Sequence, residues 1–122
     1  MREPPQAPNL LATAREVVLN DLLPHLPEAQ KFAARMVANA MAIAAREAAQ
    51  DPSWPAGMAR EIAQAMDYPA AAPPPDVLRR FARDIRAGAC DPGTPRHDDA
   101  ARLLRQMARL RCAVSAPRAL GL

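Results

Sequence analysis

The sequence predicts an all-α protein, a bundle of four to five antiparallel helices. The chain contains 29 alanines among 122 residues, and alanine is the strongest helix former. Aromatic residues make up only 3% and β-branched residues are sparse, whereas strands favour both. Fourteen prolines divide the chain into helix-length segments, in which apolar residues recur at spacings of three and four. All three observations indicate helices.

The first two helices are expected to be antiparallel neighbours. One runs from Asn9, as its cap, to about Leu23, and its inner face is Leu11, Ala14, Val18 and Leu22. After Pro24, a short linker, 25–27, leads into the longest helix, residues 28–50. The apolar stripe of that helix is Phe32, Met36, Ala40 and Ile43.

Three shorter helices follow. The third covers about residues 55–66, with Met58, Ile62 and Met66 in line, and a stiff, extended proline-rich linker, 68–75, comes after it. Asp76 is expected to cap the fourth helix and Gly88 to end it, with Leu78, Phe81, Ala82 and Ile85 facing inward. Thr94 and Pro95 predict the start of the fifth, with acidic residues in its first turn. Its inner face is Leu103, Met107, Leu110 and Val114.

The predicted organisation is a disordered leader (1–8), a single helical domain (9–116) and a frayed tail (117–122). The first residues lack the apolar stretch of a signal peptide, and no apolar run approaches the roughly 20 residues that span a bilayer. Two cysteines, Cys90 and Cys112, do not make a disulfide framework. We therefore expect a cytoplasmic protein without a membrane segment, and the thin core is compatible with a homodimer.

Asn39 interrupts the apolar stripe of the longest helix. A buried amide that lacks hydrogen bonds costs about 1–3 kcal/mol for each unsatisfied group. One interpretation is that Asn39 ties down a loop or a neighbouring helix end. The other is a ligand-binding pocket formed by Asn39 with Arg35, Arg46 and Glu47.

Positive charge is concentrated in the last two helices. Residues 1–75 carry a net charge of −2 and residues 76–122 a net charge of +5. The arginines form one face on each helix, and these faces are Arg79, Arg83 and Arg86, and Arg102, Arg105 and Arg109. They are either solvated outer faces or a basic patch for an acidic protein partner or a nucleotide-containing small molecule. Four aromatic residues cannot build a base-stacking platform, which argues against nucleic acid.

The sequence carries no catalytic signature. Its two serines, Ser53 and Ser115, do not lie in a nucleophile-elbow context, and its four glycines form no phosphate-binding loop. The histidines and cysteines show no close metal-ligand spacing. We expect no metal and no cofactor, and we assign no catalytic residue, although an enzyme assembled from distant residues stays open.

Three stretches, residues 9–24, 32–47 and 85–91, resemble a family of small uncharacterised bacterial helical proteins. The resemblance covers residues 9 to about 117. It implies a companion module of aminoglycoside-phosphotransferase-like kinases, in settings that also include acyl-CoA dehydrogenases. The family pattern also places Arg35, Asn39, Arg46 and Glu47 in its central helix. The C-terminus departs from the Asn-Pro-Arg-Tyr-like ending of other members and reads Ser-Ala-Pro-Arg-Ala at residues 115–119.

Two hypotheses follow. The first is a non-catalytic accessory module that contacts a phosphotransferase-like kinase or an acyl-CoA-linked enzyme through the arginine faces. The second is a small-molecule binding protein, with an acyl or nucleotide-like ligand against Asn39 and Arg35.

Overall fold

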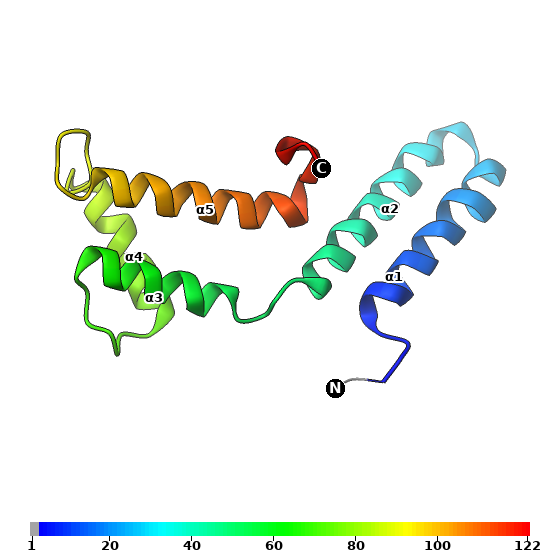
Figure 1. Ribbon diagram of the computed structural model, residues 1–122. Helices are drawn as coiled ribbons and strands as arrows, with labels where there is room; N and C mark the ends of the chain where they lie inside the picture. The colour runs from blue at the N-terminus through cyan, green and yellow to red at the C-terminus, as the bar shows by residue number, and fades with distance from the viewer. Residues whose placement is uncertain (1–2) are drawn as a thin grey trace. The chain divides into compact units, whose positions relative to one another are not determined.

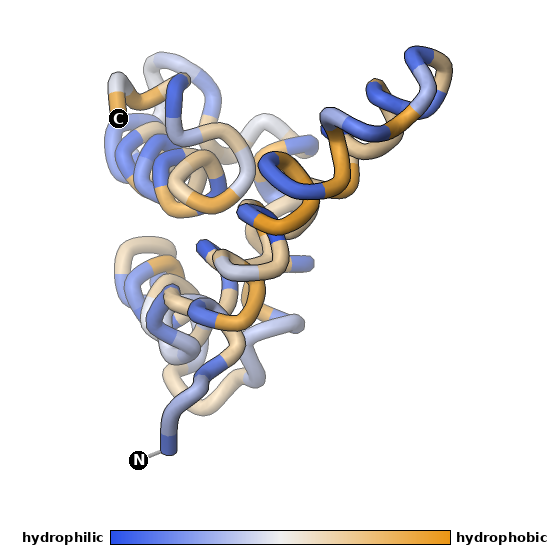
Figure 2. The backbone as a smooth tube through the Cα atoms, turned by 90° about the vertical axis from the view of Figure 1, so that its right-hand side faces the viewer, coloured by the Kyte–Doolittle hydropathy of each residue, from blue (hydrophilic) through white to orange (hydrophobic). Residues whose placement is uncertain are grey.

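The computed structural model describes residues 3–122, and in this part of the chain it contains five α-helices and no strand (Figure 1). The predicted all-α helical bundle is thereby confirmed. The helices are α1 (Ala7–Glu16), α2 (Glu28–Ala49), α3 (Trp54–Met66), α4 (Pro74–Arg86) and α5 (His97–Ser115). Hydrophobic and hydrophilic residues alternate around their turns, as expected for amphipathic helices (Figure 2). None of the described helices combines the length and apolar character needed to cross a membrane.

Contacts within the chain divide it into two compact units. Unit 1 comprises the residues up to Gln50 together with Cys112–Leu122, and unit 2 is Asp51–Arg111. The single domain predicted for residues 9–116 stays a prediction. Of the predicted leader, residues 1–2 lie outside the described part, residues 3–6 are not helical, and Ala7 and Pro8 already belong to α1.

Unit 1 is built around the antiparallel hairpin of α1 and α2 (Figure 1). α1 begins at Ala7 rather than at Asn9, because a proline fits in the first helical turn, where its missing N–H needs no acceptor. After Glu16 the backbone widens into a π-helical stretch (η1, Val17–Leu22), followed by a short 3₁₀ turn (η2, Leu23–His25). The end of the chain adds a 3₁₀ turn (η3, Pro117–Leu120) where a frayed tail is expected.

The π-helical stretch changes which residues face α2. Leu11, Ala14 and Val18 are half-buried, as predicted, but Leu22 is 51% exposed. The prediction for Leu22 is wrong because it assumes 3.6 residues per turn, whereas a π-helical turn bonds residue i to i+5 and rotates the following side chains. The N–H of Leu23 accordingly bonds to the carbonyl of Val18, five residues back.

Unit 2 contains nearly all of the buried core. α3 contributes Met58, Ile62 and Met66, as the spacing predicts, and α4 contributes Val77 and Phe81. Val77 is not among the predicted residues, while Leu78, Ala82 and Ile85 are half-buried. From α5, Ala100 and Leu103 are fully buried, and Met107 and Leu110 pack against the cluster.

The helix ends predicted for unit 2 are confirmed at Gly88 but not at Asp76. Gly88 (φ +86°) ends α4, as predicted: its N–H bonds to Ile85 O (3.1 Å), and the N–H of Ala89 bonds to Asp84 O (3.0 Å), which is a Schellman motif. Asp76 is not the cap of α4, because the helix begins two residues earlier, at Pro74.

Two further predictions about unit 2 are wrong. Thr94 does not cap α5, because its hydroxyl donates to Asp91 O (2.7 Å) within a preceding turn and the helix begins at His97. The linker after α3 is not extended, because the N–H of Ala72 turns back to Pro69 O (3.2 Å). In both places a local hydrogen bond closes a turn, instead of the helix cap or the extended linker that the residue types favour.

Candidate functional site

The sequence-predicted site lies on α2, and α2 has two apolar sides. One side is rich in alanine, contacts α1 and contains Ala38, which is 1% exposed and is the one buried residue of the described part of unit 1. Small side chains there let the two helices approach closely. The other side carries Phe32 (71% exposed) and Met36 (48% exposed). The predicted stripe is therefore an apolar face, but it does not pack into the core of unit 1.

Four residues on this second side follow one another at spacings of four, three and four. We call them the α2 seam: Phe32, Met36, Asn39 and Ile43. Successive residues of an α-helix are about 100° apart, so the four lie within a narrow strip along the helix. Alternating spacings of four and three are typical of helices that pack as a coiled coil. The seam therefore has the pattern of a contact surface for another helix.

Asn39 is solvent-exposed rather than buried. No buried polar or charged residue occurs among residues 3–122. The premise that Asn39 must satisfy a buried amide is therefore wrong for the chain by itself, because the amide is hydrated and the penalty does not arise. The penalty would return once a second surface covered the seam.

The other three predicted site residues do different things. Arg35 and Glu47 are exposed, on opposite flanks of the seam. Arg46 is half-buried, and its Nε donates a hydrogen bond of 2.7 Å to the backbone carbonyl of Val114. Arg46 therefore ties α2 to the last turn of α5 within unit 1. Whether Arg35, Asn39, Arg46 and Glu47 bind a ligand stays a prediction, since exposure and a structural hydrogen bond do not decide it.

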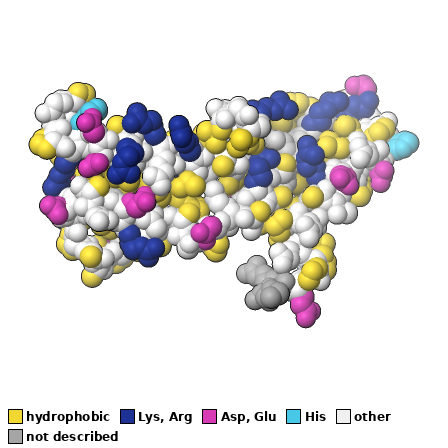
Figure 3. Space-filling view, viewed as in Figure 1, with side chains coloured by type: hydrophobic (Ala, Val, Ile, Leu, Met, Phe, Trp, Pro, Cys, Tyr) yellow, Lys and Arg dark blue, Asp and Glu magenta, His cyan; other side chains and the backbone are white. Residues whose placement is uncertain are grey.

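The two predicted arginine faces lie on the outside of unit 2. All six side chains are exposed: Arg79, Arg83, Arg86, Arg102, Arg105 and Arg109. Basic side chains stand out over α5 in Figure 3. Arg79 pairs with Asp76 (3.1 Å) and Arg102 with Asp99 (3.6 Å), while the other four form no ion pair with any described residue. The patch therefore retains uncompensated positive charge on both helices.

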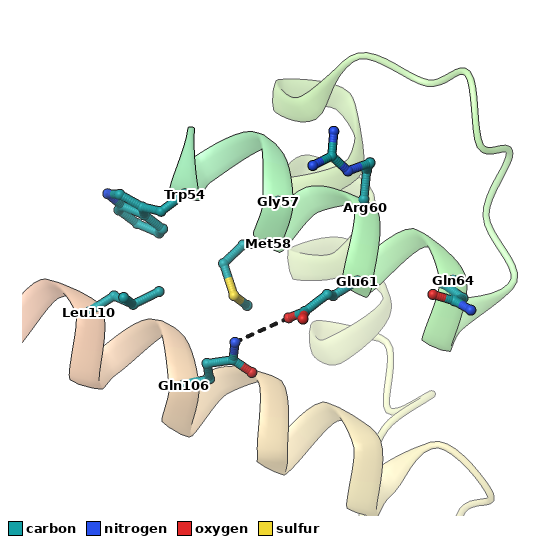
Figure 4. Close-up of a pocket in the computed structure, with 8 residues that line it drawn as sticks. All are labelled: Trp54, Gly57, Met58, Arg60, Glu61, Gln64, Gln106 and Leu110. Carbon is teal, nitrogen blue, oxygen red and sulfur yellow. Dashed lines mark hydrogen bonds between the residues drawn. The ribbon is translucent and has the colours of Figure 1, made fainter. Parts of the chain in front are cut away.

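A cleft between α3 and α5 is the site that sequence reasoning missed. Its volume is about 540 Å³, and it lies wholly within unit 2. Trp54, Met58 and Leu110 line its apolar part (Figure 4). Glu61 on α3 accepts a hydrogen bond of 3.2 Å from the Gln106 amide on α5. Gly57, Arg60 and Gln64 complete the lining, and Figure 4 shows Arg60 pointing away from α5. No local sequence motif predicts this cleft, because Glu61 on one side and Gln106 on the other are 45 residues apart in the chain.

A second polar cluster joins the segments around the core of unit 2. The buried Tyr68 donates its hydroxyl to the Asp84 carboxylate, and the guanidinium of Arg80 stacks on the Tyr68 ring, 4.2 Å from the centroid. Burial, together with the hydrogen bond to Asp84, raises the pKa of Tyr68 to about 12. This tyrosine is therefore protonated at neutral pH and acts as a hydrogen-bond donor that fixes the segment after α3 to α4.

The same cluster contains Cys90, which is 8% exposed. Burial raises the pKa of the Cys90 thiol, and the negative charge of Asp84 adds to the effect. A thiol with a raised pKa is a poor nucleophile. The carbonyl of Cys90 lies 3.0 Å from Nδ1 of His97, which joins the loop to the start of α5. Among residues 3–122 no three side chains of His, Cys, Asp or Glu gather in a way that could hold a metal ion.

The comparison with protein families identifies the family of the chain. The family described as a domain of unknown function, DUF6285, matches residues 24–119. The chain belongs to the DUF6285 family. Membership in an uncharacterised family is thereby confirmed, while the association with kinases and acyl-CoA dehydrogenases stays a prediction. No curated protein and no solved structure matches the chain.

Proposed function

We propose that this DUF6285 protein is a non-catalytic helical interaction module, which acts by presenting the α2 seam to a helix of another polypeptide. One observation carries the proposal: the described part of unit 1 buries a single alanine while Phe32 is 71% and Met36 48% exposed. Large exposed apolar side chains on one helix face mark protein contact sites, because their burial is favourable.

The partner class suggested by the family resemblance is a phosphotransferase-like kinase or an acyl-CoA-linked enzyme. The arginine faces of α4 and α5 are a second surface for such a partner, since Arg83, Arg105 and Arg109 carry charge that no described carboxylate neutralises. Charge of this kind mainly raises the association rate, whereas the apolar seam provides affinity.

A photo-crosslinking experiment tests the proposal. A benzophenone amino acid replaces Phe32 in the seam, and a matched variant carries it at Glu16, an exposed position on α1. Irradiation in cells should give a discrete, heavier adduct from position 32 and none from position 16. If position 32 yields no adduct, or position 16 yields the same one, the seam is not the contact surface.

The alternative function, small-molecule binding, is favoured by the cleft of about 540 Å³, a volume within the usual range for ligand sites. Its apolar end at Trp54, Met58 and Leu110 suits an acyl chain or a ring, and its polar end at Glu61 and Gln106 suits a hydrogen-bonding group. Thermal-shift measurements with acyl-CoAs and nucleotides test this function, because a ligand that binds only the folded state raises the melting temperature. Gly57→Leu, which fills the cleft, should abolish any shift. A shift that survives this substitution places the ligand elsewhere.

A further inference from the structure

The spacing of the α2 seam is the same in both directions along the helix. The four residues are separated by four, three and four positions, so the sequence order can be reversed without changing the pattern. In an antiparallel pair of identical helices related by a two-fold axis, residue i contacts j and residue j contacts i. Phe32 then lies opposite Ile43 of the second copy, and Met36 lies opposite Asn39. A seam of this pattern can pack on itself.

The charges on α2 agree with this register. Glu28 and Arg46 are 18 residues apart, which is about five helical turns, so they lie on the same side of α2. In the antiparallel register, Glu28 of one copy lies beside Arg46 of the other. Their positions along the helix axis differ by only about 1.5 Å, which is the rise of one residue. The Glu28 side chain is 87% exposed although it binds Lys31, and it can accept a further hydrogen bond.

We infer that the α2 seam is a self-association surface, on which α2 of a second copy of this chain packs antiparallel. The inference rests on the proposed function and names its partner. Asn39 gains a role in this arrangement, because its amide both donates and accepts and the two amides lie about 4.5 Å apart along the axis. A single polar residue in an apolar helix seam fixes register and orientation at some cost in affinity. The polar interruption then specifies how the two copies align.

The mass of the purified full-length protein in solution, measured over a concentration series by light scattering, tests the inference. The expected mass is twice 13.2 kDa. Phe32→Asp should weaken the dimer at least about 100-fold, because it places a carboxylate against Ile43 at both ends of the interface. Val37→Asp is the matched control, since Val37 is 49% exposed on the same helix but lies about 140° away from Phe32. It should leave the mass unchanged.

A charge exchange tests the register. Glu28→Arg should weaken the dimer, and adding Arg46→Glu should restore it, which only a pairing between these two positions explains. Because Arg46 also bonds to Val114 O, helicity of each variant is followed by circular dichroism. A monomeric wild type, a dimer that Phe32→Asp leaves intact, or equal effects of Phe32→Asp and Val37→Asp would overturn the inference. A monomer that still forms the position-32 adduct with another protein in cells overturns only the self-association and leaves the proposed function standing.

Discussion

Tyr68→Phe is the substitution whose effect the structure defines most closely. It removes one hydroxyl from a ring that is 6% exposed, and that hydroxyl donates to the Asp84 carboxylate. The ring itself stays, and with it the contacts with the core and with Arg80. Hydrogen bonds to charged groups contribute about 1.5–3 kcal/mol. We therefore expect the free energy of unfolding at pH 7 to fall by about 2 kcal/mol.

The raised pKa of Tyr68 predicts how this stability depends on pH. It is raised from 10.0 to about 12, so the folded state favours the protonated phenol. A group whose pKa is higher in the folded state contributes its stability below the unfolded pKa, and that contribution is lost as the pH rises through the folded pKa. The stability that Tyr68 contributes should therefore be constant below about pH 10 and fall as the pH rises toward 12. The wild type and Tyr68→Phe should therefore differ at pH 7 and converge above pH 10.

Urea titrations at pH 7, 9, 10 and 11 measure this difference. The fluorescence of Trp54, the single tryptophan, reports on unit 2, and circular dichroism reports on the whole chain. A difference below about 0.5 kcal/mol at pH 7 would refute the assignment of the hydrogen bond. A difference that does not decrease between pH 9 and pH 11 would refute the assigned pKa shift.

Four further predictions concern the core, the glycines and the seam. Leu103→Ala should destabilise the protein by about 3–4 kcal/mol in urea titrations, because Leu103 is 0% exposed and its truncation leaves a cavity. Gly88→Ala should cost about 1–2 kcal/mol, since φ is +86° and a Cβ would lie 3.0 Å from Oδ2 of Asp91. Gly57→Ala should instead add about 0.5–1 kcal/mol in the same assay, because it lies inside α3 and a Cβ there meets nothing within 4 Å. Asn39→Leu should tighten self-association about tenfold while allowing both helix orientations, which is checked by the mass and by crosslinking patterns.

Much of the fold is predictable because its signals are local. Prolines and helix-ending residues place α2 and α3 to within one residue, and the Gly88 stop is confirmed in its hydrogen bonds. The two helix caps that were wrongly predicted also rest on local signals. Asp76 and Thr94 are good capping residues, but a cap forms only if the preceding backbone is extended, and in both places the chain already turns.

The candidate site was harder to predict for a different reason. Periodicity identifies an apolar side of a helix but not what packs on it, and α2 has two such sides. The larger side chains, Phe32 and Met36, suggested the core-facing side, yet the alanine side contacts α1. The cleft between α3 and α5 depends on which turns of two distant helices meet, and no residue pattern in one sequence encodes that pairing.

The hydrogen bond between Arg46 and Val114 joins positions 68 residues apart, and it has a consequence for synthesis. Unit 2 is continuous in the chain, whereas unit 1 is completed only by Cys112–Leu122. On a ribosome, α1 and α2 emerge first, and their contacts with Cys112–Leu122 form only after Asp51–Arg111 has been translated. Phe32 and Met36 are exposed in the folded chain as well, so the seam is displayed from the moment α2 emerges. Where several ribosomes translate one message, two such nascent hairpins can meet before either chain is released.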